Sequence, residues 1–102
     1  MTVFSVLRLP VREGAGDELV RTFAELEIFE RSRQSGGFVG GRLLRPLGRD
    51  GSFLVLAEWE SVEAYQSWLA NPSRAELAER LAPLLSDEVV AGDLFEVTEE
   101  AR

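Results

Sequence analysis

Hydrophobic residues recur along this chain in two patterns, one typical of strands and one typical of helices. Short runs rich in apolar and β-branched residues predict four strands, at 2–9, 38–44, 53–59 and 91–98. Apolar residues spaced three and four apart predict three helices between them, at 17–35, 61–71 and 73–82. The resulting order, β-α-β-β-α-α-β, predicts an α+β fold of the ferredoxin-like type with a four-stranded antiparallel sheet.

Local signals mark where the predicted helices begin. Asp17 and Ser61 each precede an apolar stripe and are expected to cap the helices that follow them. Ser73 is followed three residues later by Glu76, which matches a capping box for the third helix.

Glycine pairs mark irregular points in the predicted sheet. Gly40 and Gly41 suggest a bulge, or a place where another part of the backbone or a side chain approaches closely. The segment 48–51, Gly-Arg-Asp-Gly, predicts a hairpin that pairs the second and third strands antiparallel.

Two of the predicted strands are apolar on both faces. The strand at 53–59 is apolar at its odd positions and also at Leu54 and Leu56, and the strand at 2–9 repeats this pattern. Such strands need cover on both sides, whereas the helices of this topology cover only one face of the sheet. We therefore expect a homodimer in which the open sheet faces of two copies meet.

Composition bounds the function. The chain of 102 residues predicts one domain over 1–98 with a polar tail at 99–102. A net charge of −7 argues against nucleic acid and against an anionic membrane surface. No stretch is long and apolar enough to span a bilayer, and the N-terminus resembles a strand more than a signal peptide, so we expect a cytoplasmic protein. The absence of His and Cys removes imidazole and thiolate ligands, and we expect no metal site.

The segment 58–65, EWESVEAY, together with Trp68–Leu69, Asn71–Pro72 and the junction Gly36–Gly37–Phe38, closely resembles the antibiotic biosynthesis monooxygenase family. The resemblance covers nearly the whole chain. It implies a dimeric α+β barrel, with a pocket between the sheet and the helices of each subunit.

The family has two branches with recognisable sites. In cofactor-free monooxygenases that oxidise anthrone-like polyketides, a Trp and a Tyr associated with catalysis match Trp59 and Tyr65, whereas Val55 and Ala78 replace an Asn and an Arg. In haem-degrading members a Trp matches Trp68, but Leu7 replaces an Asn and Ala78 replaces the haem-ligating His. Because the chain has no His, we set the haem mechanism aside.

The resemblance to the first branch implies oxidation of a planar aromatic, such as an anthrone or quinol, by molecular oxygen without a cofactor. Tyr65 would donate a hydrogen bond to the developing oxyanion, Arg80 or Arg74 would offset its charge, and Trp59 and Trp68 would stack on the planar ring. Phe23, Trp68, Arg74 and Arg80 are the expected substrate-binding residues, which follow from the two aromatic faces and the two available cations.

Other interpretations stay open. Glu58 or Glu60 would act as the base only if burial raised its pKa. Trp59 also suits simple packing, and Tyr65 and Trp68, three apart, suit any helix that docks on a sheet. A dimeric protein that binds a small hydrophobic ligand or regulates a partner without catalysis is the alternative function, and a housekeeping quinol oxidase is a third.

Overall fold

The computed structural model of the chain describes residues 2–48, 51–89 and 92–101. Its elements in chain order are β1 (Val3–Leu9), α1 (Gly16–Glu25), α2 (Ile28–Ser35), β2 (Phe38–Leu44), β3 (Phe53–Trp59), α3 (Val62–Leu69), α4 (Ser73–Leu81), a 3₁₀ turn (Ala82–Leu84) and β4 (Asp93–Glu96). The strands form one antiparallel sheet in the order β2-β3-β1-β4. The predicted α+β, ferredoxin-like fold is confirmed.

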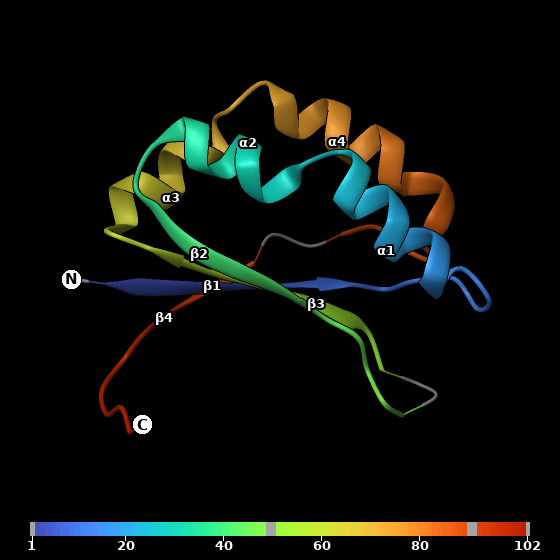
Figure 1. Cartoon of the computed structure of the whole chain (residues 1–102), viewed down its shortest axis with the longest axis horizontal. Coiled ribbons are helices and arrows are strands. Elements are labelled where there is room, and N and C mark those ends of the chain that lie inside the picture. Colours follow the sequence, from blue (N-terminus) through green and yellow to red (C-terminus); the bar gives the residue numbers. More distant parts are fainter. Residues whose placement is uncertain (1, 49–50, 90–91, 102) are drawn as a thin grey trace.

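All four α-helices lie on one side of the sheet, and the described residues place no helix on the other side (Figure 1). None of the described helices is long and apolar enough to cross a membrane. The fold therefore gives the sheet two faces with different surroundings, an inner face under the helices and an outer face away from them.

The inner face is built from alternate residues of the two central strands. Directly opposed pairs, such as Leu9 with Phe53 and Val3 with Trp59, place their side chains on the same side of the sheet. These four residues are buried and join the core cluster with apolar residues from all four helices. Their burial under the helices is the main source of hydrophobic stabilisation within one subunit.

The outer face is also apolar. Val6 of β1 lies opposite Leu56 of β3, and Phe4 lies opposite Phe95 of β4. Phe4, Val6 and Leu56 are half-buried, whereas 53% of Phe95 is exposed. The predicted two-sided character of the strands is thus present in the structure.

The first helix is not continuous, which corrects the prediction of one helix over 17–35. It breaks after α1, and Glu27 adopts left-handed backbone angles (φ 51°, ψ 46°) before α2 begins. In an unbroken helix, Leu26 and Ile28 would point in nearly opposite directions, because each residue turns the chain by about 100°. The break allows both side chains to be buried, and Arg31 Nε donates to the carbonyl of Leu26, just after the end of α1, at 2.9 Å.

One predicted cap is confirmed and two are wrong. Ser61 Oγ accepts a hydrogen bond from the Ala64 backbone N–H at 3.1 Å, as expected for an N-cap. Asp17 lies inside α1 and instead pairs with Arg45 at 2.8 Å. Ser73 is not the cap of α4, because its N–H and hydroxyl both donate to Asn71 Oδ1.

The glycines of the second strand and of the turn before it are explained by close packing. The pairing of β2 with β3 shifts register between Phe38 and Gly40, which confirms the predicted bulge. A Cβ atom on Gly41 would lie 2.5 Å from the ring of Phe29, so a side chain there would displace α2. Gly37 has a φ of 74° and its Cα faces Ala64 of α3.

Two predictions reach beyond the described residues. The hairpin tip at 49–50 and the predicted start of the last strand at 91 lie outside them. The strands on either side of the tip do pair antiparallel, as predicted. The described part of the last strand, Asp93–Glu96, ends before the expected limit at Thr98.

Candidate active site

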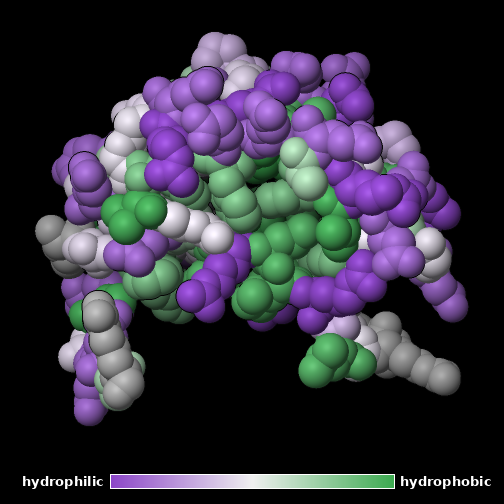
Figure 2. Space-filling model, viewed as in Figure 1, coloured by the Kyte–Doolittle hydropathy of each residue, from purple (hydrophilic) through white to green (hydrophobic). Residues whose placement is uncertain are grey.

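A cavity of about 1060 Å³ lies between the inner face of the sheet and the helices. In the space-filling view, hydrophobic residues gather around a hollow between these two layers, and hydrophilic residues surround it (Figure 2). A volume of this size is at the upper end of the range for small-molecule sites. The core is therefore incompletely filled on the side of the sheet that the helices cover.

Each layer contributes to the wall. Apolar side chains predominate, and the polar exceptions come from β1, α2, α3, α4, the turn at Asn71 and the segment 86–88. The residues used below are Ser5, Leu7, Leu9, Phe23, Phe29, Ser32, Val55, Trp59, Tyr65, Trp68, Asn71, Arg74, Leu77, Ala78 and Leu81, with Ser86–Val89 at an exposed edge.

Trp59 lies at the inner edge of the cavity wall with 1% of its surface exposed. Its indole N–H donates to Ser5 Oγ at 3.0 Å, across the paired strands β3 and β1. Its ring packs edge-on against Phe38 and against Tyr65, with centroid distances of 5.4 and 5.7 Å. Because this N–H is already paired, Trp59 offers a ligand its ring and no free donor.

Tyr65 projects from α3 and is buried against Trp59. Burial raises the pKa of Tyr65 above its ordinary value of 10.0; the positive charge of Arg74 lowers it in part, and the carboxylate of Asp93 raises it. The phenol therefore stays protonated at neutral pH and can donate a hydrogen bond into the cavity.

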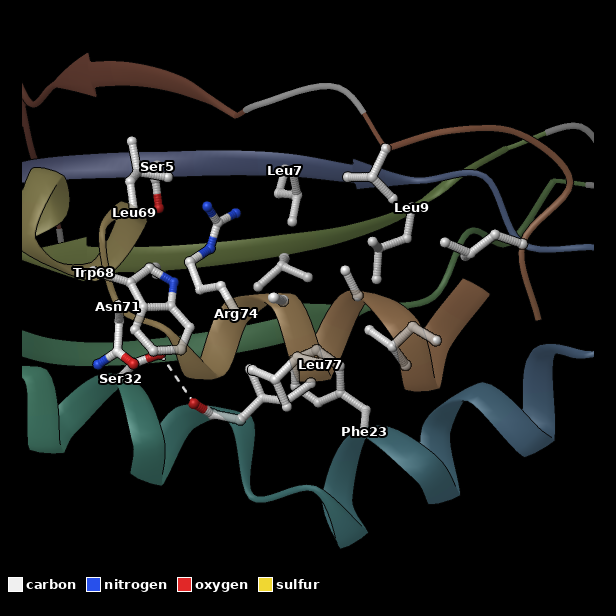
Figure 3. A pocket seen from close by; sticks show the side chains of 18 of the residues that line it. Ser5, Leu7, Leu9, Phe23, Ser32, Trp68, Leu69, Asn71, Arg74 and Leu77 are labelled. Atoms are coloured by element: carbon white, nitrogen blue, oxygen red, sulfur yellow. Dashed lines mark hydrogen bonds between the residues drawn. The ribbon is translucent and has the colours of Figure 1, made fainter. Parts of the chain in front are cut away.

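Polar groups gather at one end of the cavity. In the close view, Ser5, Ser32, Trp68, Asn71 and Arg74 lie toward one side, and the Arg74 side chain extends from α4 toward the sheet (Figure 3). Ser32 Oγ donates to the Ile28 carbonyl at 2.9 Å and is thus already engaged. The Arg74 guanidinium and the Trp68 indole N–H make no hydrogen bond with the described residues.

The other end of the cavity is apolar. Leu9, Phe23 and Leu77 lie toward this side in Figure 3, and Leu81 of α4 also lines the wall. Phe23 packs edge-on against Phe29, with ring centroids 5.2 Å apart. The cavity thus has a donor-rich end and a hydrocarbon end, which suits a flat ligand with polar substituents on one side.

The structure brings together most of the residues that the sequence grouped as a site. Trp59, Tyr65, Phe23, Trp68 and Arg74 all line the cavity.

Three other candidates lie elsewhere. Arg80 is exposed on α4 and does not line the cavity, so the structure does not bring it together with the other candidates. Although Arg80 lies only three residues after Leu77, the rotation of α4 about its own axis directs Arg80 to solvent. Glu58 belongs to the outer face of β3, opposite Phe4, and Glu60 is exposed, so neither is placed to act as a base in the cavity.

Two lining residues were missed in the sequence. Ser5 is the one polar residue among the inner-facing positions of β1, and strict alternation along that strand was a signal that could have identified it. Asn71 was interpreted as part of a helix stop. Its carboxamide oxygen also accepts two hydrogen bonds from Ser73, the first residue of α4, which directly precedes Arg74. Among the described lining residues the carboxylates are Asp87 and Glu88, both exposed.

The fold and the cavity agree with what the chain is similar to. Residues 2–85 match the sequence profile of the family described as antibiotic biosynthesis monooxygenase. A relative from Mycobacterium tuberculosis, named heme oxygenase (mycobilin-producing), is 37% identical over 75 residues, which cover 74% of this chain and 70% of the relative. The chain belongs to the antibiotic biosynthesis monooxygenase family.

Two solved structures from different branches resemble the whole fold. SnoaB, a cofactor-independent oxygenase from Streptomyces nogalater, has a TM-score of 0.75 and 29% identity, with 97% of this chain and 95% of that chain covered. MhuD, a heme-degrader from Mycobacterium tuberculosis solved with two hemes in its active site, has a TM-score of 0.77 and 32% identity, with 98% and 99% covered. These similarities support an oxygenase-like role.

Proposed function

We propose that this protein is a cofactor-independent monooxygenase that oxidises a planar aromatic, such as an anthrone or quinol, with molecular oxygen. The observation that carries the proposal is the pairing of a large apolar cavity with a protonated phenol, Tyr65, at its donor-rich end. The similarity to the cofactor-independent SnoaB supports the same class of reaction.

The proposed reaction needs few protein groups. An anthrone that releases one CH₂ proton to solvent at the exposed edge of the cavity becomes an electron-rich enolate, which passes an electron to oxygen directly. The CH₂ group becomes C=O: one atom of O₂ stays bonded to that ring carbon, and the other leaves as water with the two hydrogens of the CH₂ group. The substrate supplies the electrons, so the protein has to bind the ring, stabilise the enolate oxygen and exclude water.

Each wall residue has a role in this scheme. Tyr65 donates a hydrogen bond to the enolate oxygen, and Arg74 places positive charge at the same end of the cavity. Trp59 holds the Tyr65 ring edge-on and is itself held by Ser5. Trp68 and Phe23 contact the faces and edges of the bound ring.

The wall does not fit haem as a ligated group. Protein ligands of haem iron are His, Cys, Met or deprotonated Tyr. The sequence has no His and no Cys, Met1 lies outside the described residues, and burial raises the pKa of Tyr65 and keeps its phenol neutral. The activity named for the Mycobacterium relative is therefore not carried over to this chain.

We further propose that two copies associate through the outer sheet face. That face carries Val6, Leu56 and Phe95 with no described element over it. Removing such a surface from water contributes about 25 cal/mol per Å², so even a modest interface rivals the whole stability of a small domain.

Aerobic turnover tests the enzyme proposal. The protein is mixed with anthrone-like and quinol substrates, and quinone absorbance and oxygen consumption are followed together. Loss of one oxyanion donor costs about 10²–10³-fold in rate, so Tyr65→Phe should slow oxidation by about that factor. Ser67→Ala, an exposed change on the same helix, is the control.

The alternative function, a ligand-binding or regulatory protein without catalysis, makes the opposite prediction. It expects tight binding of the aromatic with no quinone formed above the rate in buffer. A turnover rate that is unchanged by both Tyr65→Phe and Trp59→Phe would also discard the catalytic assignment.

A further inference from the structure

Arg74 differs from the other arginines whose side chains are held in place in this structure. Arg31 pairs with Glu76 at 3.1 Å, Arg45 pairs with Asp17 at 2.8 Å, and Arg12 donates to the Pro83 carbonyl at 3.3 Å. Arg74 is half-buried and lines the cavity, yet it makes no ion pair and no side-chain hydrogen bond with the described residues.

An unpaired guanidinium in such a place is costly to the protein. Arg74 extends into a cavity whose wall is mostly apolar (Figure 3), where part of its hydration is lost. The chain holds 18 acidic residues, but none of the described ones, including Asp87 and Glu88 at the exposed edge of the cavity, makes an ion pair with this guanidinium. An anion that enters with the ligand would supply the missing partner.

The anion has to be present when the ligand binds. An enolate exists only during the reaction, so it cannot offset the cost of keeping Arg74 unpaired beforehand or drive binding. A carboxylate carried by the substrate is ionised at neutral pH, and the planar guanidinium matches its two oxygens bidentately.

Neighbouring groups suit the same ligand. The Trp68 N–H lies at the same end of the cavity as Arg74 and makes no hydrogen bond with the described residues, while Leu9, Phe23 and Leu77 line the apolar end. A flat ring with its acidic group on one edge would place the acid on Arg74 and the rings among these apolar side chains.

We propose that the cavity selects planar aromatic ligands that carry a carboxylate, and that Arg74 is the residue that selects them. The inference rests on the proposed function in taking this cavity as the substrate site. It adds the charge and the orientation of the substrate, which that function leaves open.

Binding of two matched ligands tests the proposal. Anthraquinone-2-carboxylate and anthraquinone-2-carboxamide have the same rings and differ in charge, and both are already oxidised, so binding is measured without turnover. Quenching of tryptophan fluorescence, checked by calorimetry, reports the two dissociation constants. We expect the carboxylate to bind about tenfold to a hundredfold tighter.

Variants locate the effect. Arg74→Gln should weaken binding of the carboxylate by about that factor and leave binding of the carboxamide unchanged. Arg74→Lys should restore part of the preference for the carboxylate. Arg80→Gln removes the same charge from the exposed side of the same helix and should change neither constant. Circular dichroism verifies that each variant is folded.

Several results would overturn the proposal: equal binding of both ligands, no binding of either, or an Arg74→Gln variant that weakens both alike. The enzyme proposal fails separately. A protein that prefers the carboxylate but does not oxidise anthrones keeps this inference and loses the oxygenase assignment. A protein that oxidises anthrones but binds the carboxylate and the carboxamide equally does the reverse.

Discussion

The two faces of the sheet have similar apolar sequences but different surroundings. Both carry apolar side chains from β1 and β3, in alternation along each strand. The inner face is covered by four helices and encloses a cavity of about 1060 Å³, whereas the outer face has no described element over it.

The difference shows what each face is for. The inner face is covered by helices that do not fill the space above it, so part of the possible packing is given up to make room for a ligand. The outer face keeps an apolar patch around Val6, Leu56 and Phe95, bordered by charged residues such as Arg42 and Asp93, and this patch is suited to a second copy of the same sheet. The predictions below test this division, beginning with the largest expected effect.

A single charge introduced on the outer face should prevent dimer formation. Val6→Glu places a carboxylate on the outer face between Leu56 and Asp93, where the directly opposed residues offer no cation, and we expect the dimer to dissociate into monomers at micromolar concentration. Light scattering measures the mass. Val20→Glu, the same kind of change at an exposed position of α1, should leave the mass unaltered. A wild-type protein that is monomeric at this concentration would contradict the proposal outright.

Matched truncations on the two faces should differ in size and in concentration dependence. Leu9→Ala on the inner face should lower the free energy of unfolding by about 2–5 kcal/mol, because Leu9 is 2% exposed. Leu54→Ala, on the outer face of the adjacent strand, should cost less at low protein concentration and more at high concentration, where the dimer forms. Urea unfolding at two concentrations measures both, and equal, concentration-independent losses would show that the faces are not distinct.

The hydrogen bond beneath the cavity should matter to stability. Ser5→Ala leaves the buried indole N–H of Trp59 without its acceptor, at a cost of about 1–3 kcal/mol. Thermal unfolding followed by circular dichroism gives the value, and Ser67→Ala at an exposed position is the control. If a double change with Trp59→Phe destabilised the protein by the full sum of both single changes, the bond would contribute nothing.

The smallest expected effect is on alkaline stability. Because burial raises the pKa of Tyr65, the unfolded chain loses this proton first as the pH increases past the ordinary value of 10.0. Stability from the buried phenol is therefore complete below that pH and is lost as the pH rises through the pKa of the folded protein. Tyr65 is the only tyrosine, so near-ultraviolet absorbance reports its ionisation alone. A midpoint at or below the ordinary value would refute the burial.

Much of the fold was predictable because local patterns and the tertiary structure agree. The alternation in β1 and β3, the cap at Ser61 and the bulge at Gly40 each follow from the residues of a short segment. The break at Glu27 did not, because it arises from the need to bury both Leu26 and Ile28 against distant parts of the chain.

The candidate site was predictable only in part, for a similar reason. Tyr65 and Trp68 were found through the family resemblance, and helical spacing puts both on one face of α3. The choice between Arg74 and Arg80 depends on how α4 is rotated about its own axis as it packs on the sheet, and a single sequence does not define that rotation. The spacing of the two arginines from Leu77 and Leu81 did not favour Arg74 strongly enough to exclude Arg80.

A crystal structure of the protein with anthraquinone-2-carboxylate tests the central claim, that one sheet face holds a ligand and the other holds a second subunit. We expect the rings between Phe23 and Trp68 under the helices, the carboxylate on Arg74, and two copies joined through their outer faces. Rings bound on the outer face, or a subunit whose outer face meets only solvent, would contradict it.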